Sequence, residues 1–213
     1  MMYEIFRILG IIAAYPIQLV FFKRRTFCEN GNKKLRRIKG GALIISNHFN
    51  VVDYIMNLFV VMPRKLTVVA AELAFKHAFV RFSMRFFGAI EANRVSKNLS
   101  FIDEGAAVIN KGRLLQIFPE GHNTPDGSIQ EFSTSYIMIA HRANSPIIPI
   151  VGDGNYGLFR RASVIIGEPI YLMDYCPDGN MTGEKISQIN DAIHKKMCKL
   201  KNELEENKRA KRR

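Results

Sequence analysis

The sequence is poor in cysteine, and its cysteines show no arrangement typical of a metal site or a disulfide framework. Cys28, Cys176 and Cys198 are odd in number and far apart. No CxxC pair and no cysteine–histidine cluster has the spacing of metal ligands. We therefore expect three reduced thiols in a cytoplasmic setting, and no metal centre.

Motifs of several other functional classes are also missing. There is no GxSxG elbow, which argues against a serine hydrolase. The stretch GDGNYG at 152–157 matches a dinucleotide-binding pattern, but a turn and a strand follow it where such a site needs a helix. We expect a tight turn there. No DNA- or RNA-binding motif is present, so nucleic acid is not the expected partner.

Acidic residues are few relative to basic ones. The chain has 213 residues, with 31 Lys and Arg against 19 Asp and Glu, which gives a net charge of +12. Such a surplus favours an anionic partner, which here means anionic membrane lipid or an acidic substrate carrier. The hydrophobic fraction of 47% is that of a globular or membrane-associated protein.

The apolar stretch near the N-terminus is too short to cross a bilayer. The chain carries no charge from Ile8 to Phe22, and Lys23, Arg24 and Arg25 follow at once. A helix of that length spans about 22 Å, whereas the hydrocarbon core is about 30 Å thick. Residues 1–25 are therefore expected to form a membrane-associating helix with a basic flank, peripheral or monotopic at the cytoplasmic face of the cell membrane. A buried N-terminal helix is the alternative.

The remainder, residues 26–213, alternates strand-like and helix-like segments without a linker or repeat. Strands are expected at 42–46, 66–70, 89–92, 114–118, 147–151 and 163–167, and helices near 53–62, 72–87, 99–111 and 134–144. Apolar residues from Ile186 to Leu204 recur in steps of three and four, which predicts a C-terminal amphipathic helix before a basic tail. The pattern predicts a single α/β domain whose mixed, largely parallel sheet is flanked by helices.

A histidine and a carboxylate follow the first of these strands in the segment NHFNVVD. On one continuous helix His48 and Asp53 would lie about 140° apart and could not meet. They can meet if His48 lies in the turn after the strand and Asp53 in the first helical turns. The carboxylate would then fix the imidazole tautomer and leave the other ring nitrogen free as a general base.

Three further segments follow in order: GAIEANR at 88–94, FPEGHNTPDG at 118–127 and SPIIPIV at 145–151. With NHFNVVD, they resemble the four sequence blocks of the glycerolipid acyltransferase family, typified by lysophosphatidic acid acyltransferases. The resemblance runs from about Ser46 to Ile170. It implies an O-acyltransferase that moves a fatty acyl chain from acyl-CoA or acyl carrier protein to a lysophospholipid hydroxyl, without a metal or another cofactor.

The resemblance also implies roles for individual residues. His48 would be the general base and Asp53 its orienting partner, so that the hydroxyl attacks the thioester directly. Arg94 would bind the acceptor phosphate, because a guanidinium contacts two oxygens at once. Asn47, Glu120 and Gly121 would complete the substrate-binding residues.

Two departures from the family pattern concern the acceptor headgroup. His122, Asn123 and Thr124 stand where the family usually has Thr-Arg-Ser, and FSTS at 132–135 stands where it tends to have Phe-Lys-x-Gly. Lysophosphatidate, giving phosphatidate, is the first choice of acceptor, with another lyso-lipid or an amphipathic alcohol as the alternative. A non-catalytic, membrane lipid-binding relative is the alternative from another class. The oligomeric state is left open.

Overall fold

A seven-stranded sheet forms the centre of the protein. The computed structural model describes residues 10, 13, 15, 16, 18–20, 22–71, 88–92, 99–158 and 160–211. The strands lie in the order β1-β7-β6-β2-β5-β3-β4, and only the β6–β7 pair is antiparallel. Their bounds are β1 Arg25–Cys28, β2 Ala42–Ser46, β3 Leu66–Ala71, β4 Ile90–Ala92, β5 Leu114–Ile117, β6 Ile147–Gly152 and β7 Ser163–Ile166.

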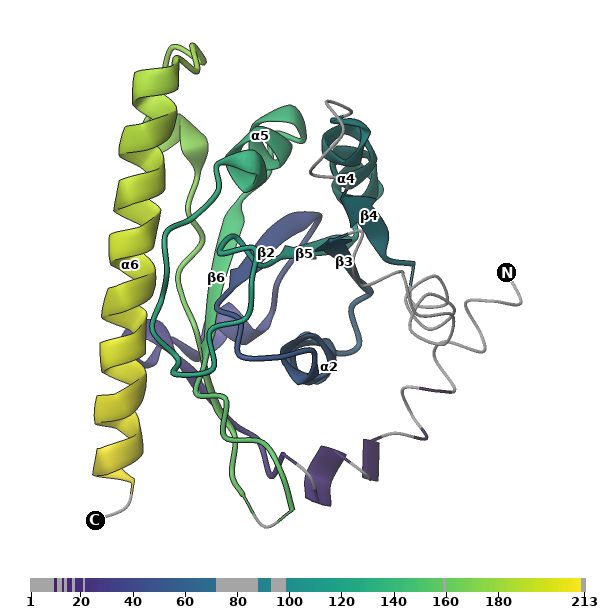
Figure 1. Ribbon diagram of the computed structural model, residues 1–213, viewed down its shortest axis with the longest axis vertical. Coiled ribbons are helices and arrows are strands. Elements are labelled where there is room, and N and C mark those ends of the chain that lie inside the picture. Colours follow the sequence, from purple (N-terminus) through teal and green to yellow (C-terminus); the bar gives the residue numbers. More distant parts are fainter. Residues whose placement is uncertain are drawn as a thin grey trace.

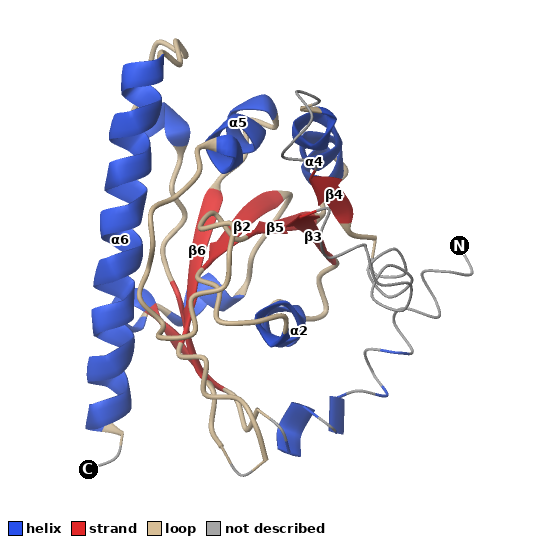
Figure 2. Cartoon of the chain, in the orientation of Figure 1, coloured by secondary structure: helices blue, strands red, loops and turns tan. Residues whose placement is uncertain are grey.

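Helices cover both faces of this sheet, as Figure 1 shows. The α-helices are α2 (Val52–Val60), α4 (Ser100–Asn110), α5 (Ser135–Arg142) and α6 (Gly183–Ala210), and the short 3-10 helices are η1 (Glu29–Gly31), η2 (Lys33–Arg36) and η4 (Leu172–Asp174). In Figure 2, α4, α5 and α6 lie on one side of the sheet and α2 on the other. The expected helix at 72–87 lies outside the described residues.

Strand β2 shows why the central strands are continuously apolar. Leu43 and Ile45 join the hydrophobic cluster that includes residues of α4, α5 and α6, whereas Ala42 and Ile44 join the cluster on the α2 side. All four are fully buried. A parallel strand covered on both faces needs apolar side chains in both directions, which explains the run ALII.

The predicted α/β architecture is confirmed, including the long amphipathic C-terminal helix. The apolar positions of α6 are buried against the sheet at Ile189, Ile193, Met197, Leu200 and Leu204. Thr182 caps this helix by accepting a hydrogen bond from the Lys185 N–H at 3.3 Å. The sequence did not predict β1, which lengthens the sheet at the β7 edge.

The predicted apolar membrane-associating helix at the N-terminus falls mostly on residues outside the described part, and no apolar membrane helix is found among the described ones. Within residues 22–71, 88–92, 99–158, 160–211 and the few placed before them, no helix has the length and apolar character that a membrane crossing requires. Most of residues 1–21 lie outside the described part. Of the placed side chains there, Tyr15 packs edge-on against Phe59 of α2, and Phe22 packs against Phe59 and Tyr156. Arg25 belongs to β1, so the sheet includes the last residue of the segment 1–25.

Candidate active site

The loop between β2 and α2 brings His48 and Asp53 together as predicted. The Nδ1 atom of His48 lies 3.0 Å from Oδ2 of Asp53. Strand β2 ends at Ser46 and α2 begins at Val52, so His48 stands in the connecting turn and Asp53 in the first helical turn. The positive end of the α2 dipole favours a carboxylate at this position.

Asp53 is held by hydrogen bonds to both of its oxygens. Oδ2 accepts from the backbone N–H of Phe49 at 2.7 Å and of Asn50 at 2.8 Å, as well as from His48. Oδ1 accepts from the hydroxyl of Tyr156. The side chain of Asp53 is only 3% exposed. A carboxylate this deeply buried needs such donors to offset its lost hydration.

The contact with Asp53 determines which nitrogen of His48 carries the proton. A carboxylate can only accept, so Nδ1 donates and Nε2 of the neutral ring keeps its lone pair. The imidazole stacks on Phe118, with ring centroids 3.9 Å apart and planes 18° from parallel. Its side chain is 17% exposed. The arrangement therefore presents a fixed, accessible base, which suits removal of a proton from a bound hydroxyl.

Tyr156 is a member of the site that sequence reasoning missed. Burial, followed by the negative charge of Asp53, raises the pKa of its phenol above the ordinary value, so the hydroxyl stays protonated and donates to Asp53. Tyr156 lies in the GDGNYG segment, where Gly154 and Gly157 have positive φ. The Tyr156 N–H donates to the Gly154 carbonyl at 2.9 Å, so the chain bends at these residues within the longer connection from β6 to β7. The only signal for Tyr156 was its position in this turn just after a strand.

Glu120 lies next to His48 and holds its backbone. Oε1 of Glu120 accepts from the His48 N–H at 3.2 Å, and Oε2 accepts from Thr124 Oγ1 at 2.8 Å. Thr124 in turn donates its N–H to the His48 carbonyl at 2.7 Å. Gly121 forms the turn itself, with φ of 74°. Glu120 and Thr124 thus hold the backbone of His48 in place, and substrate binding by Glu120 and Gly121 stays a prediction.

Asn47 joins the ends of two strands. Its Nδ2 donates to the Gly152 carbonyl at 3.1 Å, and its Oδ1 accepts from the Gly152 N–H at 2.9 Å. This buried amide aligns β2 with β6 directly beside His48, and its predicted contact with substrate stays a prediction. Arg94, the predicted phosphate ligand, lies outside the described residues.

Phe49 is enclosed by two glycines from different loops. A Cβ atom on Gly127 or on Gly154 would lie 2.5 Å from a ring carbon of Phe49. Both glycines have positive φ, of 74° and 64°. Phe49 neighbours His48 and donates its N–H to Asp53. Because they lack a side chain, the two glycines let the Phe49 ring pack closely against their loops.

Gly154→Ala is expected to lower the free energy of unfolding by about 2–4 kcal/mol, because strain at positive φ adds to overpacking against Phe49. Turnover should fall as well, since Phe49 is tied to Asp53. The matched control is Gly179→Ala, where φ is 69° and a Cβ would meet open space. Urea denaturation of both variants is the measurement. Equal destabilisation of the two would show that the contact with Phe49 is unimportant.

Comparison with known proteins identifies the family of this chain. The family model described as "Acyltransferase" matches residues 26–152, which include the whole His48–Asp53 loop and the Glu120 turn. The chain belongs to the acyltransferase family. The matched segment runs from Thr26 in β1 to Gly152 at the end of β6, and Gly152 is the partner of Asn47.

Individual relatives within the acyltransferase family are distant. The chain is 27% identical over 158 residues to a 1-acyl-sn-glycerol-3-phosphate acyltransferase of Cocos nucifera, covering 72% of this chain and 51% of the relative. It is 21% identical over 157 residues to the enzyme of the same name from Limnanthes alba, covering 73% and 56%. The chain thus spans about half the length of the curated relatives it matches.

A solved structure shares the fold. The crystal structure of the 1-acyl-sn-glycerophosphate (LPA) acyltransferase PlsC from Thermotoga maritima aligns with a TM-score of 0.59 at 20% identity, covering 88% of this chain and 73% of that chain. This alignment extends beyond the segment matched by the family model.

Proposed function

We propose that the protein is an O-acyltransferase that moves a fatty acyl chain from a thioester to the hydroxyl of a lysophospholipid, with lysophosphatidate as the first-choice acceptor. The observation that carries this proposal is the His48–Asp53 pair, whose contact at 3.0 Å leaves Nε2 of His48 available as a base. The names of the relatives support the reaction class and the acceptor class.

The chemistry follows from the state of the imidazole. Nε2 of His48 takes the proton from the acceptor hydroxyl as its oxygen attacks the thioester carbonyl carbon. A C–O bond forms, the C–S bond breaks, and the departing thiolate takes the proton from the imidazolium. Asp53 stabilises the transient imidazolium and keeps Nδ1 protonated. No covalent acyl-enzyme is needed, and no cofactor enters beyond the thioester substrate, acyl-CoA or acyl carrier protein.

A position at the cytoplasmic membrane face suits lipid substrates. Val51, just before α2, and Ile55 within it are 58% and 42% exposed, and the N-terminal segment exposes Leu19 and Val20. Exposed aliphatic side chains next to basic residues are typical of a surface that contacts a bilayer. We place the protein there as a peripheral or monotopic protein.

The acceptor headgroup is tested through Arg94 and Asn123. Arg94→Ala should raise the KM for lysophosphatidate about tenfold or more, with a smaller effect on the donor, because a charge-assisted contact with phosphate is lost. Arg94→Lys should rescue only in part, since an ammonium cannot make the two-pronged contact. Asn123→Arg should improve the use of lysophosphatidate. The measurement is steady-state kinetics with a phosphomonoester acceptor and an uncharged acceptor of equal chain length.

Two outcomes would contradict this assignment. An equal loss for both acceptors in Arg94→Ala would mean that Arg94 supports the fold. A wild-type preference for the uncharged acceptor would favour the alternative of another lyso-lipid or an amphipathic alcohol, which the HNT sequence at 122–124 suggests.

The function itself is tested by an acyl-transfer assay over a panel of lyso-lipids and simple alcohols with both donors. The proposal expects a new ester with at least one acceptor and one donor. A protein that binds lyso-lipid in vesicles but forms no ester with any pair would instead be the non-catalytic lipid-binding relative.

A further inference from the structure

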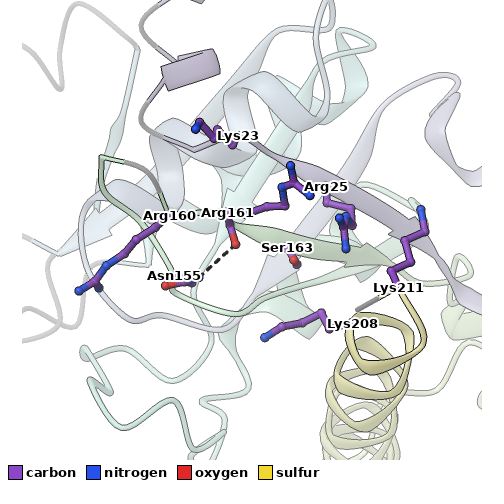
Figure 3. A pocket seen from close by; sticks show the side chains of 8 residues that line it. All are labelled: Lys23, Arg25, Asn155, Arg160, Arg161, Ser163, Lys208 and Lys211. Carbon is purple, nitrogen blue, oxygen red and sulfur yellow. Dashed lines mark hydrogen bonds between the residues drawn. The ribbon is translucent and has the colours of Figure 1, made fainter. Parts of the chain in front are cut away.

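A strongly basic cavity of about 510 Å³ is lined by residues that do not include His48 or Asp53. Figure 3 shows side chains from three parts of the chain gathered around it: the start of β1, the segment joining β6 to β7, and the end of α6. Its cationic lining residues are Lys23, Arg25, Arg160, Arg161, Lys208 and Lys211. Its volume is that of a small-molecule site.

The strand registers put this cavity at the same end of the sheet as His48, where β2 and β6 have their carboxyl ends. Strands β2 and β6 run parallel, with Ser46 opposite Ile150, and both finish at that end of the sheet. Strand β7 runs antiparallel to β6 and starts there, with Val164 opposite Gly152. Strand β1 starts beside it, with Arg25 opposite Ser163.

One segment connects the two sites directly. Between β6 and β7, Tyr156 donates its hydroxyl to Asp53, while its neighbour Asn155 and the later Arg160 and Arg161 line the cavity. A ligand that occupied the cavity would therefore bind beside the loop that orients the catalytic carboxylate.

Hydrogen bonds hold the walls of the cavity together. The Arg25 N–H donates to the Ala162 carbonyl at 2.8 Å, and the Ala162 N–H donates to the Phe22 carbonyl at 2.7 Å. Asn155 Nδ2 donates to the Arg161 carbonyl at 3.2 Å, as drawn in Figure 3. The cavity is thus built before any ligand arrives, which lowers the cost of binding.

The positive charge around the cavity is only partly neutralised. Lys208 pairs with Asp153 at 3.0 Å and with Glu205 at 2.7 Å. Although burial opposes its charge, its hydrogen bonds to Glu205 and Asp153 raise the pKa of Lys208 above the ordinary value. Across the residues that the structure describes, no carboxylate pairs with Arg25, Arg160, Arg161 or Lys211. Cations collected at one concave site repel one another unless an anion binds between them.

We propose that this cavity binds clustered phosphate groups. Guanidinium and ammonium groups that line one cavity from three parts of the chain match several phosphates better than one carboxylate. Two sources have this chemistry: the adenosine 3′-phosphate and 5′-diphosphate of a coenzyme A thioester, and the phosphates of a lipid headgroup. The first rests on the proposed function, because it makes the cavity the anchor of the acyl donor. The second does not.

Calorimetry with three probes tests the proposal and its source. Coenzyme A carries the full set of phosphates, dephospho-coenzyme A lacks the 3′-phosphate, and pantetheine has none. Coenzyme A should bind, dephospho-coenzyme A more weakly, and pantetheine least. The variant Arg160→Ala/Arg161→Ala should weaken coenzyme A binding about tenfold or more, and leave pantetheine unchanged. Flotation with vesicles of phosphatidylcholine, with and without added phosphatidate, tests the lipid source.

The matched control is Lys195→Ala/Lys199→Ala, which removes two exposed cations from α6 away from the cavity. Loss of coenzyme A binding in the arginine variant alone supports the nucleotide source. Loss of phosphatidate-dependent flotation in that variant alone supports the lipid source. The proposal is overturned if the arginine variant and the lysine control lose binding alike. It is also overturned if the protein binds neither coenzyme A nor vesicles that contain phosphatidate. These are binding measurements and do not depend on acyl transfer. A protein that binds coenzyme A in this cavity but transfers no acyl chain would support the phosphate site and contradict the proposed function.

Discussion

His48→Ala is expected to lower acyl transfer by about 10²–10⁴-fold, the usual contribution of a positioned general base. The variant loses Nε2, which no other described group at this loop replaces, because the neighbouring Asp53 is buried and still accepts from three donors, the Phe49 and Asn50 N–H groups and the Tyr156 hydroxyl. It should remain folded, since the ring contributes one stacking contact and one hydrogen bond, together worth about 2 kcal/mol. Release of free thiol from the acyl donor is the measurement.

His141→Ala is the matched control for this variant. His141 lies exposed in α5, so its removal should leave turnover within about twofold of wild type, as expected for a surface side chain outside the site. A His48→Ala protein that is folded and keeps most of its turnover would show that the imidazole is not the base.

Asp53→Asn is expected to reduce turnover nearly as strongly and to lower the free energy of unfolding by about 2 kcal/mol. The amide keeps the shape of the side chain but has no charge to stabilise the imidazolium, and hydrogen bonds to a charged partner are worth about 1.5–3 kcal/mol. It also offers an N–H₂ group where the carboxylate accepted only. Turnover and urea denaturation measure the two effects separately.

The comparison for stability is Asp103→Asn. Asp103 pairs with Arg142 at 2.8 Å, but both side chains are 64% exposed, so the change should cost less than about 1 kcal/mol. The double variant His48→Ala/Asp53→Asn should be no slower than His48→Ala alone, because the carboxylate acts through the imidazole. Losses that multiply in the double variant would mean that Asp53 acts independently of His48.

Much of the fold could be predicted from the sequence because the buried strands are continuous runs of apolar residues. The run ALIIS becomes β2 with the predicted bounds, and LTVVA and IIPIV each lengthen by one residue in β3 and β6. The contact between His48 and Asp53 was predictable because a strand followed by a helix leaves few ways to bring positions five apart together.

The rest could not be predicted because it depends on contacts between distant segments. Strand β1 is the short RTFC, whose apolar pattern is too brief to stand out, and it exists only through pairing with β7. Tyr156 reaches Asp53 from 103 positions away, and Asn47 reaches Gly152 from 105. The basic cavity likewise joins side chains from both ends of the chain, so no local sequence pattern marks it.

The most direct test of the account counts products in one reaction with an acyl thioester and lysophosphatidate. Direct attack by the acceptor hydroxyl predicts one free thiol for every new ester, thiol release that depends on the acceptor, and an unchanged protein mass when the donor is supplied alone. Thiol release without the acceptor, or a protein whose mass has increased by one acyl group, would contradict direct transfer with His48 as the base.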